Sequence, residues 1–271
     1  MRKLTVTICL TIVALLKIAG MSWSADYQKG MNAYDKGDYA TAMREWIPIA
    51  EQGNISAQYN LGNMYSNGKG VPQNYEIAVK WYSLAAKQGD AGGQNNLGWM
   101  YANGKGVPQN YEAAVKWYTL AAKQGDASAQ YNLGWIYDNG EGVLQNYKTA
   151  VKWYTLAAKQ GFASAQYNLG WIYDNGNGVP QDYVASAKWY TRAAEQGHAS
   201  AQSSLGWTYY SGEGVPKDFI YAHMWMNLAV AQGDDEANDN RSIIEKKMTS
   251  AQIAEAQRMA RECVIKKYKG C

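Results

Sequence analysis

Apolar residues recur with a helical period through the middle of the chain. Between residues 127 and 139, Ala129, Leu133 and Tyr137 are four positions apart, so they share one face of a helix. Between residues 147 and 159, Ala150 and Tyr154 belong to a second apolar run with three- and four-residue spacing. The pattern therefore predicts two amphipathic helices joined by a short connection.

Helix start and stop signals frame both segments. Asp126 and Asn146 stand where a side chain accepts hydrogen bonds from the free N–H groups of a first helical turn. Gly140 follows the first helix and suits the left-handed conformation that ends many helices. In later copies of the pattern, Phe162 and His198 stand in place of the capping aspartate and break the pattern.

The connection between the helices is rich in glycine and occurs five times. Its fourth copy, YDNGNGVPQDY at residues 173–183, raises the question of a phosphate loop or a calcium loop. A phosphate loop follows a strand and a calcium loop needs acids at alternate positions, whereas here a helix comes first and glycines hold those positions. The copies begin 36 residues apart, at Tyr65, Tyr101, Tyr137, Tyr173 and Tyr209. We interpret them as repeated connections and expect neither a metal nor another cofactor.

The whole two-helix unit repeats with the same step. A glycine inside a helix costs ~1 kcal/mol relative to alanine, so the recurrence of Gly134 predicts a close approach of the partner helix with no side chain between. One helical hairpin cannot bury its apolar face alone, so neighbouring units must stack. We divide the chain into a signal peptide (1–25), a degenerate N-terminal repeat (26–53), five full repeats (54–233) and C-terminal capping helices (234–271), with about fourteen helices in all.

The C-terminal segment is expected to close the stack. The residues from Thr249 to Gln252 form a capping-box sequence at the start of a helix. The expected inner face of this helix consists of Ile253, Ala256, Ala260, Cys263 and Val264. Cys263 and Cys271 either form a disulfide in an oxidising compartment or are two unpaired thiols, and the sequence leaves both alternatives open.

The repeat resembles a known family. The pattern A-x-A-Q-x-x-L-G-x-x-Y-x-x-G-x-G-V, followed by A-x-x-W-Y-x-x-A-A-x-x-G, resembles the Sel-one-like repeat, a relative of the tetratricopeptide repeat, over residues 55–233. The resemblance implies an all-α fold, a right-handed α-α superhelical solenoid of two-helix repeats with a 36-residue period. Family members act mostly as adaptors that hold protein partners, and many bacterial members are exported. A cysteine-rich branch resembles β-lactam-hydrolysing proteins, but the lack of cysteine between Asp26 and Glu262 argues against that activity here.

The first 25 residues have the pattern of an export signal. Arg2 and Lys3 precede an apolar run from Leu4 to Leu16 that is short for a membrane span, and Lys17 interrupts it; a retained anchor is the alternative. These three basic residues account for the whole formal net charge of +3, so the processed chain is neutral and has no basic excess for nucleic acid. We expect a periplasmic or secreted protein with no nucleic-acid partner, in contact with a membrane only through an uncleaved signal.

The first helix of each repeat also has a face that points away from its partner helix. The expected binding residues on this side are Tyr59, Asn63, Trp99, Asn103, Tyr131, Trp135, Asn139, Tyr167, Trp171, Asn175, Trp207 and Tyr210, with Asp138 and Asp174 beside them. Tryptophan and tyrosine are frequent at binding hot spots, and asparagines can bond a peptide backbone. The hypothesis is a concave groove for an extended segment of another protein, from the envelope or a host. The alternative is that these tryptophans pack between repeats as core.

A second tryptophan row lies on the other helix of each repeat. Its members, Trp81, Trp117, Trp153, Trp189 and Trp225, are assigned to the core because they follow the apolar spacing of that helix.

No catalytic constellation accompanies the repeats. The two histidines are His198, at a cap position, and His223, where other repeats have valine, so a buried or edge histidine is expected there. No Ser/His/Asp order and no metal-ligand spacing stands out. We therefore predict a protein-binding adaptor and not an enzyme. The alternative function is binding of cell-wall glycan, whose sugar rings stack on aromatic side chains, or a β-lactam-related hydrolase activity.

Overall fold

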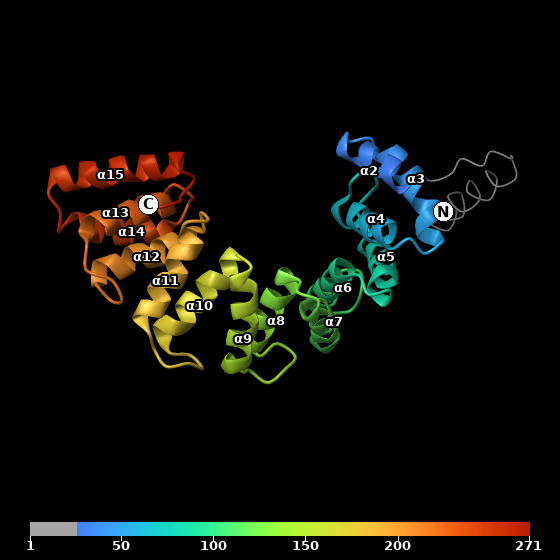
Figure 1. Cartoon of the computed structure of the whole chain (residues 1–271), viewed down its shortest axis with the longest axis horizontal. Helices are drawn as coiled ribbons and strands as arrows, with labels where there is room; N and C mark the ends of the chain where they lie inside the picture. The colour runs from blue at the N-terminus through green and yellow to red at the C-terminus, as the bar shows by residue number, and fades with distance from the viewer. Residues whose placement is uncertain (1–25) are drawn as a thin grey trace, which may run out of the picture. The chain divides into compact units, whose positions relative to one another are not determined.

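The computed structural model describes residues 26–271, and the predicted signal peptide lies outside this range. Within the described residues every regular element is a helix, and there are fourteen of them (Figure 1). None of these helices is long and apolar enough to cross a bilayer. The expectation of an all-α solenoid of two-helix repeats is thus confirmed.

Residue contacts divide the chain into two compact units that meet in sequence between Gln88 and Gly89. The first unit contains α2 (Tyr27–Asp35), α3 (Tyr39–Glu51), α4 (Ile55–Asn67) and α5 (Tyr75–Lys87). The second contains α6 (Ala91–Asn103), α7 (Tyr111–Lys123), α8 (Ala127–Asn139), α9 (Tyr147–Lys159), α10 (Ala163–Asn175), α11 (Tyr183–Ala194), α12 (Ala199–Ser211), α13 (Phe219–Val230), α14 (Asp235–Glu245) and α15 (Ser250–Ile265). Each unit has hydrophobic clusters of its own.

In the second unit, helical hairpins stack in chain order. The hairpins pair α6 with α7, α8 with α9, α10 with α11, and α12 with α13. The second helix of each hairpin also contacts the first helix of the next, as α7 contacts α8 and α9 contacts α10 (Figure 1). At the C-terminal end α13 contacts both α14 and α15. Each repeat therefore buries its apolar faces against its immediate neighbours.

Side chains at the predicted positions cap these helices. The Asp126 carboxylate accepts a hydrogen bond from the backbone N–H three residues on at 2.7 Å, and the Asn146 side chain does the same at 2.9 Å. His198 also caps its helix, since its Nδ1 accepts from the N–H of the third residue after it at 3.3 Å. Phe162 makes no side-chain cap bond. Of the two residues that break the aspartate pattern, only Phe162 therefore leaves the helix uncapped.

The glycine-rich connection packs against the preceding repeat. Gly140 and Gly142 have φ values of 75° and 67°, a conformation in which a side chain is strained. A Cβ atom at Gly142 would also overlap the Cβ of Tyr111, the first residue of α7. The loop needs glycine both for its turn and for its fit on the neighbouring hairpin, which is why it recurs in every repeat.

The glycine in the middle of each first helix makes room for an aromatic ring. A Cβ atom on Gly134 would lie 2.5 Å from the ring of Tyr154, which is buried on α9. The prediction of a close helix approach with no side chain between is therefore wrong, because the tyrosine ring fills the space. In the last hairpin Met226 takes the tyrosine's place, and a Cβ on Gly206 would lie 3.0 Å from the carbonyl oxygen of Ala222. There a backbone atom of the partner helix is the nearest neighbour.

The first hairpin of the chain, α2 with α3, makes the same contact despite its shorter loop. A Cβ atom on Gly30 would overlap the indole of Trp46, just as one on Gly62 would lie 2.5 Å from the ring of Tyr82. Trp46 is completely buried. The segment from 26 to 53 thus has the packing of a repeat although its loop lacks the glycine motif.

A row of buried glutamines joins neighbouring helices through hydrogen bonds, a role that the apolar pattern of the sequence does not predict. Gln130 on α8 is 4% exposed. Its Nε2 donates to the carbonyl oxygen of Ala122 on α7 at 3.1 Å, and its Oε1 accepts from Nε2 of Gln160 at the end of α9 at 2.8 Å. One side chain therefore links three consecutive helices and satisfies its own buried polar atoms.

The second tryptophan row is only partly core. Trp225 is 2% exposed, but Trp81, Trp117, Trp153 and Trp189 are half-buried. Trp153 packs against the cluster formed by α7 and α8, and Trp189 against the cluster formed by α9 and α10. These half-buried indoles pack where adjacent hairpins meet and remain partly exposed to solvent.

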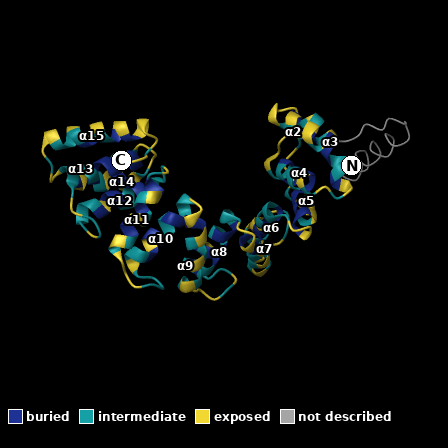
Figure 2. Ribbon diagram, in the orientation of Figure 1, coloured by how far each residue is buried: buried dark blue, intermediate teal, exposed yellow. Residues whose placement is uncertain are grey.

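The last helix, α15, begins with the predicted capping box between Thr249 and Gln252. On its inner face Ala256, Ala260 and Cys263 are buried, whereas Val264 is 49% exposed. The assignment of Val264 to that face is wrong, because it lies about 100° around the helix from Cys263. The outer side of α15 is exposed (Figure 2). Cys263 and Cys271 are joined by a disulfide, so the structure has the bonded form of the two alternatives.

Candidate protein-binding surface

Four tryptophans form an exposed row on the second unit. This indole row consists of Trp99, Trp135, Trp171 and Trp207, one on each of α6, α8, α10 and α12, and their exposed fractions lie between 39% and 42%. Each follows, two residues on, a leucine that is at most 1% exposed. Two positions turn about 200° around a helix, so a buried leucine directs the indole outward. The indoles are not sealed between repeats, which was the alternative interpretation.

The predicted tyrosines lie beside the indole row, held by other rings. The ring of Tyr131 is 5.8 Å from that of Tyr154 and 5.0 Å from that of Phe162, measured between centroids. The ring of Tyr167 stacks on His198 at 4.9 Å. The residues that replace the capping aspartate therefore give Tyr131 and Tyr167 an aromatic neighbour, which restricts their orientation.

The predicted asparagines are exposed but already bonded to their own helices. Nδ2 of Asn139 donates to the carbonyl oxygen of Trp135 at 2.9 Å, and Nδ2 of Asn175 donates to that of Trp171 at 2.8 Å. Asn103 makes the same bond in α6. Because this bond uses one of the two N–H groups of each amide, it fixes the side chain, which then presents its second N–H and its carbonyl oxygen to a ligand.

Tyr59 and Asn63, the first predicted site residues, belong to the other unit of the chain. The hydroxyl of Tyr82 donates to Oδ1 of Asn63 at 2.8 Å, and the rings of Tyr59 and Tyr82 are 6.2 Å apart. At the opposite end of the predicted set, the Tyr210 ring lies 5.0 Å from that of Trp207. Within the second unit the structure thus places the predicted residues from Trp99 to Tyr210 on the successive first helices.

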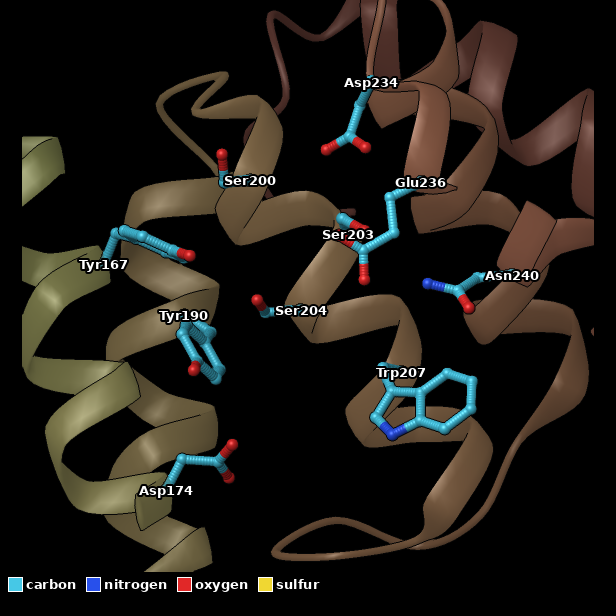
Figure 3. Close-up of a pocket in the computed structure, with 10 residues that line it drawn as sticks. All are labelled: Tyr167, Asp174, Tyr190, Ser200, Ser203, Ser204, Trp207, Asp234, Glu236 and Asn240. Atoms are coloured by element: carbon cyan, nitrogen blue, oxygen red, sulfur yellow. The ribbon is translucent and has the colours of Figure 1, made fainter. Parts of the chain in front are cut away.

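A cleft opens at the C-terminal end of the indole row (Figure 3). Its volume is about 390 Å³, within the range of about 300–1,000 Å³ typical of ligand sites. It is formed by α10, α11, α12 and the start of α14, which supply Tyr167, Asp174, Tyr190, Ser200, Ser203, Ser204, Trp207, Asp234, Glu236 and Asn240. The walls are mostly polar, with Trp207 and the half-buried Tyr167 as the aromatic surfaces, since Tyr190 is 2% exposed.

Negative charge gathers in this cleft. Burial raises the pKa of Asp174, and the nearby carboxylate of Glu213 raises it further. Burial also raises the pKa of Tyr167, to which Asp234 and Glu236 contribute. These shifts indicate that Asp174 and Tyr167 lie in a partly desolvated space with carboxylates nearby.

The repeat pattern of the sequence predicts only part of the cleft. Tyr167, Asp174 and Trp207 were assigned to the binding side from their helix positions. The serines of α12 and the acidic residues of α14 were not predicted. The acidic residues could not be found from the repeat, because α14 follows the last repeat in the chain. A repeat-based pattern cannot reveal a contact made by a helix outside the repeats. The available signal was the change of composition at Asp234, where the chain becomes strongly acidic over three residues.

The two histidines have structural contacts. His223 is completely buried, with its Nε2 2.9 Å from Oε1 of Glu245 and its Nδ1 2.8 Å from Nδ2 of Asn227. The first of these contacts joins α13 to α14. Across residues 26–271 no group of histidine, cysteine or acidic side chains could hold a metal ion.

Comparisons with known proteins agree with this architecture. The Sel1 repeat model matches residues 55–90, 91–126, 127–162, 163–198 and 199–234. The chain is similar to the solved Sel1 repeat protein from Oxalobacter formigenes, with 33% identity, a TM-score of 0.77, and coverage of 92% of this chain and 98% of the other. It is also similar to c5321, a protective antigen of uropathogenic Escherichia coli strains that displays an SLR fold, with 29% identity, a TM-score of 0.52, and coverage of 89% and 68%. No curated protein sequence matches the chain.

Proposed function

This chain belongs to the Sel1 repeat family, and we propose that it is an adaptor that binds an extended segment of another protein along α6, α8, α10 and α12. Sel1-like solenoids generally mediate protein–protein interaction. The adaptor presents one binding position per repeat, and a partner in extended conformation meets these positions in turn. The protein contributes a preformed surface and no chemistry of its own.

The observation that carries this proposal is the exposure of all four indoles of the row. A tryptophan that is about 40% exposed leaves a large apolar area in water, and here one such indole recurs on each of four successive first helices. Exposed apolar surface that is concentrated on one side of a protein marks an interaction site. Tryptophan is also the residue type most enriched at binding hot spots. The buried leucines and the ring contacts of Tyr131 and Tyr167 hold the surface in place, which lowers the entropy lost on binding.

The proposed compartment is the periplasm or the outside of the cell. Support comes from the basic and apolar pattern of the first 25 residues and from the neutral charge of the remainder. The disulfide between Cys263 and Cys271 fits an oxidising compartment. The partner is then an envelope protein or a protein of another cell. Cell fractionation of the full chain, with N-terminal sequencing of the product, tests this placement.

Site-specific photo-crosslinking tests the adaptor function. A benzoylphenylalanine in place of Trp135 or Trp171 is expected to crosslink to the same partner in cells, and mass spectrometry should place both crosslinks on one continuous segment. The same group in place of Leu156, which is 44% exposed on a second helix, should not reach that segment. A synthetic peptide of the segment should bind the full chain, and Trp171→Ala should weaken binding at least about tenfold, as expected for a hot-spot residue.

Two outcomes would contradict the adaptor function. Crosslinks that scatter over many proteins, with no common segment, would show that the row has no specific partner. Saturable binding of muropeptides that depends on Trp135 and Trp171, or hydrolysis of a chromogenic β-lactam by the pure protein, would favour the glycan or hydrolase alternative.

A further inference from the structure

The cleft at the end of the indole row has the lining of a site for an organic cation. Asp174 comes from α10, Asp234 and Glu236 come from the start of α14, and none of the ten lining side chains is basic. Figure 3 shows the carboxylate of Asp174 on one side of the cleft, beside Tyr190, and those of Asp234 and Glu236 on the other, with Ser204 between them. The carboxylate of Asp234 is fixed, because it also caps α14 through the N–H of Ala237 at 2.9 Å.

The three carboxylates of the cleft are separated from one another, so they suit a cation with delocalised charge better than a compact one. Within the described residues no cluster of acidic, histidine or cysteine side chains is close enough to hold a metal ion. A guanidinium group, by contrast, is planar and has five N–H donors that can reach two carboxylates and several hydroxyls at once. The serine hydroxyls of α12 add acceptors on the same surface.

Aromatic side chains at the cleft also suit a guanidinium group. Trp207 is 42% exposed at the cleft, and Tyr167 lies half-buried on the other side, whereas Tyr190 is 2% exposed and offers little ring surface. A guanidinium stacks on indole and phenol faces, and the attraction grows where water is excluded. A lysine ammonium is more strongly hydrated and lacks the flat shape, so it would use this combination of groups less well.

We propose that this cleft binds an arginine side chain of the partner segment, at the end of the indole row nearest α14. The proposal rests on the adaptor function above and adds a requirement to it. Charge complementarity selects the occupant: a cleft with three carboxylates and no basic lining residue favours a cationic partner, and the aromatic walls favour arginine among the cations. The indole row supplies affinity for apolar side chains, and the cleft sets the register of the bound segment.

Peptide selection on the intact protein tests this assignment. Phage-displayed random twelve-residue peptides are selected on the full chain and, in parallel, on Asp174→Asn, Glu236→Gln and Glu112→Gln variants. Peptides selected on the unaltered chain should share an arginine at one fixed distance from an apolar motif. The first two variants should lose this enrichment. Glu112→Gln removes the same charge from the exposed first turn of α7 and should retain it.

The binding of individual synthetic peptides then measures how much the arginine charge contributes to affinity. Replacement of the shared arginine by citrulline, which keeps the shape and removes the charge, should raise Kd about tenfold, and lysine should bind more weakly than arginine. Asp174→Asn should abolish the preference for arginine over citrulline. Circular dichroism of each variant establishes that it is folded, and a Trp171→Ala variant reports on the indole row separately.

The outcomes separate this proposal from the adaptor function. Selected peptides that need Trp171 but show no arginine preference, or that bind equally with citrulline, would overturn the arginine site and leave the adaptor intact. Equal binding of lysine and arginine peptides would overturn the assignment of arginine. Failure to select any peptide that depends on Trp171 would overturn the adaptor function itself.

Discussion

At the scale of single residues, Asp174 is the side chain whose state the fold changes most clearly. The spacing of the repeat placed it on the binding side, next to Trp171 and Asn175. The structure adds that it lies half-buried in a cleft, where desolvation and Glu213 raise its pKa above the ordinary value of 3.8. A carboxyl group whose pKa is higher in the folded than in the unfolded state favours folding when protonated and opposes it when ionised.

This shift predicts a pH-dependent gain in stability for Asp174→Asn. Stability from the protonated group is fully present below pH 3.8 and is lost as the pH rises through the raised folded-state pKa. The asparagine variant avoids the loss, so its Tm should exceed that of the unaltered chain at pH 7 and converge with it as the pH falls below 3.8. Calorimetric scans across this range measure the difference.

The control for this experiment is Glu112→Gln, which removes an exposed carboxylate far from the cleft lining. It should show no comparable gain at pH 7. A lower Tm for Asp174→Asn than for the unaltered chain at pH 7 would mean that the ionised carboxylate stabilises the fold, contrary to the direction of its pKa shift.

At the scale of the helices, some features of each repeat depend on local sequence, and others depend on contacts with neighbouring helices. Caps, glycine turns and the LGxxY spacing could be interpreted from the sequence because each acts within a few residues. The buried role of Gln130 could not, because a glutamine among alanines has the pattern of a solvent-facing position. Its partners, Ala122 and Gln160, are distant in sequence and meet it only when α7, α8 and α9 have packed. The recurrence of glutamine at the 36-residue step was the available clue.

The glutamine contact predicts a loss of stability for Gln130→Leu. The carbonyl oxygen of Ala122 would keep only the N–H of Gly125, and the amide of Gln160 would keep only the carbonyl of Gly125. Two buried hydrogen bonds are lost, and at about 0.5–1.5 kcal/mol each they predict a loss of about 1–3 kcal/mol. Urea denaturation followed by circular dichroism measures the change. Gln145→Ala, which removes an exposed hydrogen bond to the Asp138 carbonyl, should cost less than about 0.5 kcal/mol because water replaces it. Equal losses in the two variants would contradict the role of burial.

At the scale of the whole molecule, stability is distributed along a series of similar interfaces. The first helices α8 and α10 have the same sequence, ASAQYNLGWIYDN, so α7 would meet the same residues whichever of them followed it. In a stack where each repeat contacts only its neighbours, a whole repeat can be removed without exposing a new surface. A partial repeat cannot, because it leaves an unpaired helix.

Deletion of residues 127–162 should therefore leave a folded protein, one repeat shorter, with the cleft and the capping helices retained. Its helical content per residue should equal that of the full chain, and size-exclusion chromatography should show a monodisperse species. Deletion of residues 127–144 is the matched comparison, because it removes one helix and its loop. We expect that shorter deletion to aggregate or to lose cooperative unfolding. If both deletions behave alike, the repeats are not the units of folding.

The sequence by itself determined the two-helix repeat, its 36-residue step and the helix on which each candidate residue lies. These features depend on local spacing, capping and backbone conformation, which a chain carries in its order of residues. Only the tertiary structure decided that the row from Trp99 to Trp207 is exposed while Trp225 is buried. It alone joined Asp174 to Asp234 and Glu236 across the cleft. Exposure and charge clustering depend on which distant segments pack together, and the periodic pattern of one repeat does not contain that information.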